Sequence, residues 1–243
     1  MNSILAIETS TAACSVALRY QGAVFHIFEM LPQRHAHRVL EMVDEVLEQA
    51  NAHQEDIEFL AYGEGPGAFT GIRIATGVIQ GLALGWNKPV IAVSSLEAMA
   101  YSALQTHDRL HALEPINWIA MMDARMQEIY WQSGFYEPNS QRWSANPPEL
   151  LSQKTIKARL SLAMLPTPTP LMTGDIQNAY PELIEGAVNW FESLPTAKAV
   201  VALASKKTHT ARFISEHVPV PIYLRNNVAE TTIERQAKKL DQT

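Results

Sequence analysis

The chain has 243 residues, of which 47% are apolar and 18% are charged, and its formal net charge at pH 7 is -6. This composition is typical of a globular protein with a sizeable core, and it excludes an intrinsically disordered chain. The acidic balance argues against a protein that coats a nucleic acid by itself, because such proteins carry a basic stripe for the phosphate backbone. We therefore expect any contact with RNA to be indirect.

The single cysteine, Cys14, indicates the compartment. One cysteine forms neither an internal disulfide nor a multi-cysteine zinc or iron–sulfur site, which favours a cytoplasmic protein. The short apolar run that ends at Glu8 lacks the cationic start of a signal peptide. The longest apolar stretch, 74–86, is shorter than the ~18 residues of a membrane-span candidate. The sequence therefore predicts a cytoplasmic protein without a membrane segment.

The first hundred residues predict three strands followed by alternating helices and strands. The three strands are apolar runs separated by turn residues, which indicates an antiparallel meander. The first helix is predicted because apolar residues recur along one side of the segment at about 100° per residue. The order is β-β-β-α-β-α-β-α, with strands at 4–8, 14–20, 23–30, 59–62 and 89–93 and helices at 39–50, from 72 and from 94 or 95.

The second half of the chain begins with the same kind of hairpin, built from predicted strands at 118–123 and 128–136. Because no residue-level repeat accompanies it, the duplication is inferred from the order of elements alone. The remaining segments are predicted helices at 150–164, 181–194 and 197–217, an extended connector at 166–170 and an irregular tail from 219.

Two copies of a β-β-β-α-β-α-β-α unit are typical of the two-lobed α/β architecture of actin, hexokinase and the sugar kinases. We expect an amino-terminal actin-like lobe of residues 1–106 and a second lobe of residues 107–243. The end of the chain is expected to pack back on the first lobe. Such an analogy predicts the fold and leaves the function open.

A glycine-rich loop at 63–73 joins the fourth predicted strand to the second helix. Free backbone N–H groups at the start of that helix could hold an anion. The spacing of the glycines matches neither the dinucleotide-binding motif nor the P-loop, and Pro66 removes one N–H donor. A phosphate site and a plain tight turn therefore both stay open.

The helix after this loop is very apolar and carries glycine at every fourth position. Gly77, Gly81 and Gly85 form one ridge, although each glycine costs about 1 kcal/mol relative to alanine inside a helix. A glycine ridge lets another backbone approach closely, so we predict a subunit contact here. The alternative is an internal helix that packs against its own sheet and its own neighbour.

Four stretches resemble the TsaB (YeaZ) family in sequence, order and spacing: 4–18 (ILAIETSTAACSVAL), 61–84 (AYGEGPGAFTGIRIATGVIQGLAL), 122–131 (MDARMQEIYW) and 221–229 (PIYLRNNVA). The resemblance covers both ends and the middle of the chain and is weak from about 139 to 217. It implies an actin-like fold and a role beside the catalytic paralogue TsaD, which installs threonylcarbamoyl-adenosine on tRNA.

The resemblance also implies partners. A helical surface of the first lobe would pair with TsaD, and the small P-loop ATPase TsaE would join that pair. No cofactor of the chain's own is implied, and ATP or ADP at the interface of the complex stays an open option. The surface maps onto the helices at 37–50 and 72–86, with Val39, Met42, Val43, Val46, Ile74, Gly77, Val78, Gly81 and Gly85 as partner-binding residues.

The motif that supplies catalysis in the paralogues is missing. TsaD-type proteins carry valine-asparagine-histidine-x-glutamate-glycine-histidine at a strand-to-helix junction, where the two histidines hold a metal. The matching junction here has Ser95 and Met99 in place of the histidines and retains only Glu97. Neither replacement is a usual ligand for such a cation. His35 and His37 face different sides of a helix, so we predict no metal ligand and no catalytic residue.

Two acidic residues stand where actin-like kinases hold a magnesium nucleotide, at the end of each lobe's first strand. Alternatively, such carboxylates cap turns or pair with a neighbour such as Arg125. The candidate cofactor-binding residues for a nucleotide are Glu8, Thr9, Gly65, Gly67 and Asp123.

Three functions follow from these observations. The leading hypothesis is a non-catalytic scaffold that dimerises with TsaD and activates it for threonylcarbamoylation of the adenosine next to the anticodon. The rival is a freestanding phosphotransferase or ATPase that uses Glu8, Asp123 and the glycine loop. The third is a homodimeric binding protein, because the same apolar helix could pair with its own copy when the partner is absent.

Overall fold

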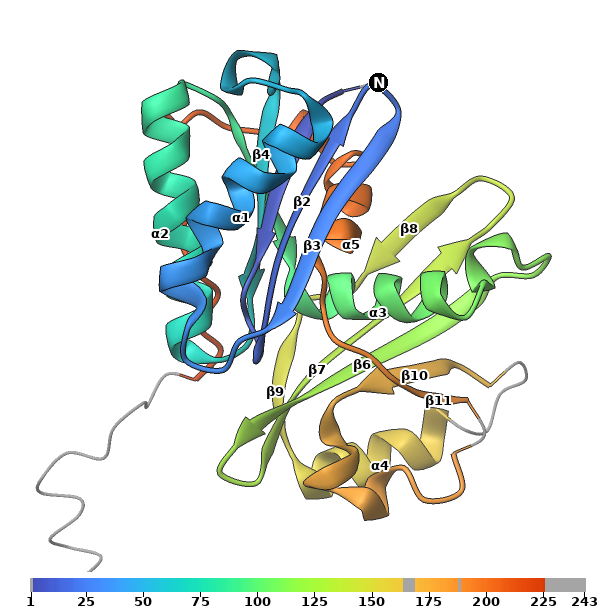
Figure 1. Ribbon diagram of the computed structural model, residues 1–243. Helices are drawn as coiled ribbons and strands as arrows, with labels where there is room; N and C mark the ends of the chain where they lie inside the picture. Colours follow the sequence, from blue (N-terminus) through green and yellow to red (C-terminus); the bar gives the residue numbers. More distant parts are fainter. Residues whose placement is uncertain (1, 164–168, 188, 226–243) are drawn as a thin grey trace, which may run out of the picture.

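The computed structural model describes residues 2–163, 169–187 and 189–225, and these form two lobes that are each built on a mixed β-sheet (Figure 1). The connector expected at 166–170 and the family-like stretch 221–229 therefore lie partly outside the described residues. Two helices, α3 (Ser95–Thr106) and α5 (Ala197–Ala204), lie between the two sheets. No helix among the residues described is long and apolar enough to cross a membrane.

The first sheet has the strand order β3-β2-β1-β4-β5. Strand β1 pairs antiparallel with β2 and parallel with β4, as expected for a meander continued by a crossover helix. Its bounds are β1 Ile4–Glu8, β2 Ala13–Tyr20, β3 Ala23–Met30, β4 Phe59–Gly65 and β5 Val90–Ser94, and helices α1 (His35–Ala50) and α2 (Phe69–Trp86) connect them.

Both faces of this sheet are covered, which explains why β1 is apolar at nearly every position. Leu5 and Ile7 point to the face packed by α1 and α2, whereas Ile4 and Ala6 point to the face packed by α5. Helix α5 belongs by residue number to the predicted second lobe, yet it contacts β1, β2, β4 and β5 of the first sheet. The inner face of the first lobe is therefore completed by a helix from near the end of the chain.

The second sheet repeats the order of the first. Its main path is β11-β10-β6-β7-β8, which corresponds strand for strand to β5-β4-β1-β2-β3, and β9 also pairs with β7. This confirms the duplicated, two-lobed actin-like fold. The bounds are β6 Ile116–Arg125, β7 Glu128–Glu137, β8 Arg142–Ala145, β9 Glu149–Ser152, α4 Gln153–Ala163, β10 Leu171–Gly174 and β11 Trp190–Glu192.

Three predicted helices of the second lobe are wrong in part or entirely. The helix expected at 150–164 begins only at Gln153, because the preceding residues pair with β7 as strand β9. The helix expected at 181–194 is a short 3-10 turn followed by β11, which pairs with β10, and Gly186 takes a positive φ of 75° between them. The helix expected at 197–217 ends at Ala204, and the chain then extends to form a bridge between Arg212 and Val90.

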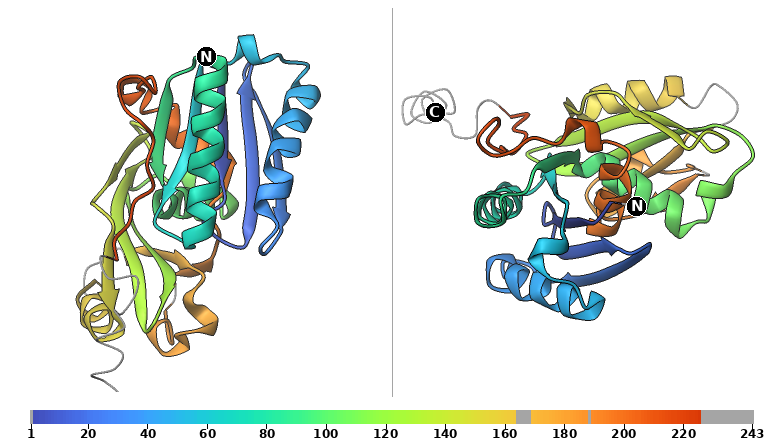
Figure 2. Two further views of the ribbon diagram at one scale, coloured as in Figure 1. Left: turned by 90° about the vertical axis from the view of Figure 1, so that its left-hand side faces the viewer. Right: turned by 90° about the horizontal axis from the view of Figure 1, so that it is seen from above.

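The last described segment, 219–225, has no regular secondary structure and runs from the first lobe to the second (Figure 2). We call it the interlobe strap. On the first lobe, the Ile222 N–H donates to Glu64 O at 2.8 Å and the Gln80 amide donates to Pro219 O at 2.7 Å. On the second lobe, the Arg225 guanidinium bonds Glu128 Oε2 at 2.6 Å. The strap therefore fastens the two lobes to each other.

Candidate partner surface and interlobe cleft

The glycine ridge of α2 faces open space. Among the residues that the structure describes, nothing outside the helix lies within 4 Å of a Cβ added at Gly77, Gly81 or Gly85. The ridge therefore packs against neither the first sheet nor α1, the neighbouring helix. Three exposed glycines in one surface helix cost stability, and no contact of the ridge with the described residues offsets that cost. Leu84 lies beside the ridge with 72% of its surface exposed.

The other predicted residues of α2 lie at the border of this surface. Ile74 and Val78 are half-buried and pack against the core of the first lobe with one side. We define the α2 surface by the three ridge glycines together with Ile74, Val78 and Leu84. It combines a stripe without side chains with one large exposed apolar residue.

Four predicted contact residues of α1 must be corrected. Val39, Met42, Val43 and Val46 are at most 2% exposed and belong to the core between α1 and the first sheet. The apolar arc of α1 therefore packs against the chain's own sheet, as amphipathic helices of globular proteins commonly do. These four side chains are not available to a partner.

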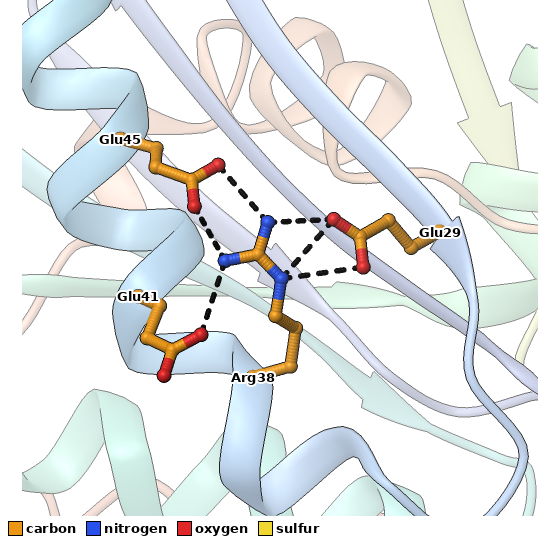
Figure 3. Close-up of polar contacts among 4 residues, drawn as sticks. All are labelled: Glu29, Arg38, Glu41 and Glu45. Carbon is orange, nitrogen blue, oxygen red and sulfur yellow. Dashed lines mark hydrogen bonds and ion pairs between the residues drawn. The ribbon is translucent and has the colours of Figure 1, made fainter.

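The outward side of α1 is charged instead. The Arg38 guanidinium lies among the carboxylates of Glu29 on β3 and of Glu41 and Glu45 on α1 (Figure 3). Hydrogen bonds from Arg38 lower the pKa of the Glu45 carboxyl. The network joins α1 to β3 and gives this side of α1 a polar character, although Leu40 on the same helix is 52% exposed.

The glycine loop is held tightly against the turn between β1 and β2. A Cβ at Gly67 would lie 2.5 Å from Ser10 O, and the Ala68 N–H already donates to that oxygen at 2.7 Å. The Thr9 hydroxyl in turn donates to Gly71 O at 2.8 Å. The loop glycines are thus needed for close backbone approach, which supports the tight-turn interpretation at these positions.

Glu8 is sealed inside the protein. Its carboxylate accepts hydrogen bonds from the Ser10 N–H at 2.6 Å and from the Ser95 hydroxyl at 2.8 Å. A Cβ at Gly63 would overlap this carboxylate, so glycine is required there. Burial raises the pKa of the Glu8 carboxyl above its ordinary value. Glu8, Thr9 and Gly65 do not line the cavity between the lobes.

That cavity, the interlobe cleft, has a volume of about 870 Å³ and includes Gly67 and Asp123 of the predicted cofactor residues. The Asp123 carboxylate bonds Arg125 at 3.1 Å, and the Asp123 N–H donates to the Asp175 carboxylate at 3.0 Å. Burial raises the pKa of Asp175 from 3.8 to about 6. Asp175 was not predicted from the sequence. It follows the apolar strand β10 directly, and an acidic residue at the end of an apolar strand was the signal that identified Glu8.

The strand-to-helix junction at Ser95 and Met99, which the family resemblance led us to expect as the counterpart of a metal site, has a structural role here. The Ser95 hydroxyl bonds Glu8, and Met99 is buried in the core against β6. Glu97 is paired with Lys207 at 3.0 Å and accepts a hydrogen bond from the Trp143 indole at 3.0 Å. Within the described ranges, no group of three or more His, Cys, Asp or Glu side chains is arranged to hold a metal.

The two histidines considered as metal ligands, His35 and His37, lie in different surroundings. His35 is buried, and its Nε2 lies 3.2 Å from Ala13 O, whereas His37 is exposed. The structure therefore does not bring them together as a pair.

Comparison with known proteins agrees with this fold and with the family motifs. The family model described as "TsaD: tRNA N6-adenosine threonylcarbamoyltransferase" matches residues 27–163. The chain is 34% identical to a protein of Haemophilus influenzae named tRNA threonylcarbamoyladenosine biosynthesis protein TsaB, over 93% of this chain and 94% of that protein. It is 35% identical to the Escherichia coli protein of the same name, over 93% of this chain and 96% of that protein.

Among solved structures, YeaZ from Pseudomonas aeruginosa is 32% identical, with a TM-score of 0.75 over 92% of this chain and 100% of that one. The strand order, the glycine-ridged α2 and nearly full-length similarity to these relatives lead to one assignment. The chain belongs to the TsaB family, within the wider group of proteins that the TsaD family model describes.

Proposed function

We propose that this protein acts in the biosynthesis of threonylcarbamoyladenosine in tRNA, as a non-catalytic subunit that pairs with a TsaD-type paralogue through the α2 surface. A TsaE-type ATPase would join that pair, and tRNA would contact this chain only indirectly. The observation that carries the proposal is the open glycine ridge, where no described residue outside the helix comes within 4 Å of a Cβ added at Gly77, Gly81 or Gly85.

The ridge suits a partner helix for a physical reason. Glycines spaced by four residues leave a groove along the helix, into which the side chains or backbone of a second helix can fit. Leu84, at 72% exposure, supplies a large apolar side chain at the edge of this groove. Burying it against a partner removes apolar surface from water and contributes to association. In the absence of TsaD, the same surface could pair with a second copy of this chain.

The junction at Ser95 and Met99 supports a subunit without its own transferase centre. A hydroxyl bonded to Glu8 and a thioether inside the core replace two metal-binding histidines. Changing these positions removes ligands that the reaction in TsaD-type proteins requires, while the partner surface on α2 is retained. The chain would then act by holding its catalytic partner in a competent conformation.

A freestanding ATPase is the weaker alternative. The interlobe cleft is large enough for a nucleotide, and Gly67, Asp123 and Asp175 line it. Yet Glu8, one of the two carboxylates expected to hold a magnesium nucleotide, is buried and hydrogen-bonded away from the cleft. ATP or ADP at the interface with TsaD fits these observations better than turnover by this chain.

Reconstitution tests the proposal directly. The purified chain, the TsaD-type and TsaE-type proteins of the same organism, the threonylcarbamoyl-adenylate and tRNA are combined, and each protein is omitted in turn. We expect no modified tRNA from this chain alone, and modification by TsaD that depends on its presence. Leu84→Glu should abolish both co-purification with TsaD and the modification.

The matched control is Leu113→Glu, because Leu113 is 87% exposed and lies away from α2 at the start of the second lobe. This variant should retain association and activity. Modification or steady ATP hydrolysis by the chain alone would contradict the scaffold role. Full activity of Leu84→Glu would contradict the placement of the contact on α2.

A further inference from the structure

A second cavity, separate from the interlobe cleft, lies between the first sheet, the turn before β8 and the segment that follows α5. Its volume is about 740 Å³, and it shares no lining residue with the cleft. Its walls include Val90 and Ala92 from β5, Leu203 from α5 and Pro219 from the interlobe strap. A recess of this size with partly apolar walls is typical of sites for small molecules. We call it the basic pocket, for the reason that follows.

Cationic side chains dominate its rim. Arg142, Lys206, Lys207 and Arg212 line the pocket, together with His209 and His217, in a protein whose net charge is -6. Glu64 is the only carboxylate among the described residues that line it. Lys207 is neutralised by Glu97, at 3.0 Å from its ammonium group.

The other three cations have no carboxylate partner within ion-pair distance in the described part of the chain. Lys206 Nζ donates to Gln141 O at 2.9 Å, and the Arg212 guanidinium donates to the carbonyl of Ala211 at 2.8 Å. Backbone carbonyls orient these groups and leave their positive charge uncompensated. Such an arrangement is favourable for binding an anion, because charge-assisted hydrogen bonds are about twice as strong as neutral ones.

The pKa values of two groups in the pocket, Lys206 and Glu64, are shifted in a way that fits a bound anion. Burial lowers the pKa of the Lys206 ammonium, which an anion beside it would reverse. Burial raises the pKa of Glu64 from 4.5 to about 7; the Lys207 ammonium opposes this increase, and the Glu97 carboxylate adds a smaller one. Near neutral pH, Glu64 is therefore partly protonated, and in that form it can donate a hydrogen bond to a phosphate oxygen.

We propose that the basic pocket binds a small phosphorylated ligand, from pyrophosphate to nucleotide size, held by Arg142, Lys206 and Arg212. Its phosphate groups would lie between these cations, and the base of a nucleotide-sized ligand would contact the wall formed by β5 and α5. The recessed shape favours a compact molecule over the backbone of a nucleic acid, which generally needs an extended basic surface.

The experiment titrates the full-length protein with pyrophosphate and with ADP by calorimetry at constant ionic strength. The double variant Arg142→Glu/Lys206→Glu should weaken binding roughly tenfold or more, because two charge-assisted contacts become repulsive. Glu64→Gln should strengthen binding severalfold above pH 7, because it removes a negative charge from the pocket while keeping its shape. One variant should weaken binding and the other should strengthen it. Unfolding of the protein could not explain both results.

The matched control is Lys154→Glu/Lys157→Glu, which makes the same charge change on exposed positions of α4. Asp123→Ala, in the interlobe cleft, should also leave pyrophosphate binding unchanged. If the α4 variant weakened pyrophosphate binding equally, the effect would come from the net charge of the protein, and the proposal would be overturned. So would the absence of binding by the unmodified protein, or a loss of tRNA binding by the pocket variant with pyrophosphate binding intact, which would point to an RNA surface.

Discussion

The Ser95 hydroxyl donates a hydrogen bond to the Glu8 carboxylate at 2.8 Å, across 87 positions of the sequence. Both side chains are buried, and the bond joins the end of β1 to the first turn of α3. By the resemblance described above, Ser95 is expected at the position of a histidine in the TsaD-type motif. In this chain the residue forms an internal bond of the first lobe.

Removing that bond should destabilise the protein. Ser95→Ala leaves Glu8 Oε2 without its hydrogen-bond donor in a buried site, and such a loss costs about 1 to 3 kcal/mol. Urea unfolding measures the change. Ser161→Ala is the control, because Ser161 is exposed on α4 and its change should stay within about 0.5 kcal/mol. Equal stabilities of the two variants would show that Glu8 finds another donor.

The open ridge on α2 makes Gly81 tolerant of larger side chains in the free protein. Gly81→Ala should stabilise the monomer by up to about 1 kcal/mol, because alanine favours helix and nothing blocks its methyl group. Gly81→Leu should leave the melting temperature of the monomer close to that of the original protein. Its bulk should nevertheless abolish the pull-down with the TsaD-type paralogue, because the partner could no longer approach closely.

The control for this pair is Ala75→Leu on the buried side of the same helix. Ala75 is 0% exposed, so leucine there overpacks the core and typically costs 1 to 3 kcal/mol. A melting curve for each variant distinguishes the two sides of α2. A Gly81→Leu monomer as unstable as Ala75→Leu would place the ridge inside the core and leave the partner surface without its main support.

Glu64 should make the stability of the protein depend on pH. Its pKa is raised from 4.5 to about 7 in the folded state, so the folded protein binds more protons than the unfolded chain between these values. Stability therefore falls as the pH rises from about 4.5 to 7, and the penalty is complete above 7. At about 1.4 kcal/mol per pH unit, Glu64→Gln should recover at most about 3.5 kcal/mol at pH 8.

The same comparison at pH 4 provides the internal control. There Glu64 is largely protonated in both states, so the substitution should change stability little. Denaturant unfolding of both proteins at pH 4 and pH 8 gives the difference. An equal effect of Glu64→Gln at the two pH values would mean that the carboxyl of Glu64 keeps an ordinary pKa.

The pair formed by Glu97 and Lys207 should contribute more to stability than any exposed ion pair. The Glu97 side chain is 8% exposed, and Lys207→Met would leave its charge buried without a cation. We expect a loss on the order of 2 to 3 kcal/mol, below that of a fully buried pair because Lys207 is partly exposed. Arg159→Met breaks an exposed pair with Glu149 and should cost well under 1 kcal/mol. Similar unfolding midpoints for both variants would contradict this.

Much of the first lobe could be predicted from the sequence, because its strands and helices have complete apolar periods and clear turn residues. In the second lobe the sequence predicted the opening hairpin, β6 and β7, but strands β8, β9, β10 and β11 were not predicted. The last crossover was missed because residues 181–194 contain apolar residues that suit a helix or a short strand equally well. Pairing of Trp190 with Met172 in the sheet decides between them, and that contact is non-local.

The open surface of α2 could be predicted from its glycines, whereas the burial of the apolar side of α1 could not be predicted, for a physical reason. The sequence marks the apolar side of an amphipathic helix, but it does not say whether that side packs on the chain's own sheet or on another chain. The apolar side of α1, which includes Val39 and Met42, packs in the core of the chain's own first lobe. The glycines of α2 were informative because they cost helix stability without filling any space inside the lobe.

The position of α5 has a consequence for protein synthesis. The inner face of the first sheet, with Ile4 and Ala6, is covered largely by the helix at Ala197–Ala204, with Ala98 of α3 beside it. A growing chain on the ribosome therefore displays this apolar face until almost the whole sequence has been translated. At about 5 to 20 residues per second, the stretch between the first lobe and the end of α5 takes roughly 5 to 20 s. During this interval the nascent first lobe is a natural substrate for chaperones that bind apolar surfaces.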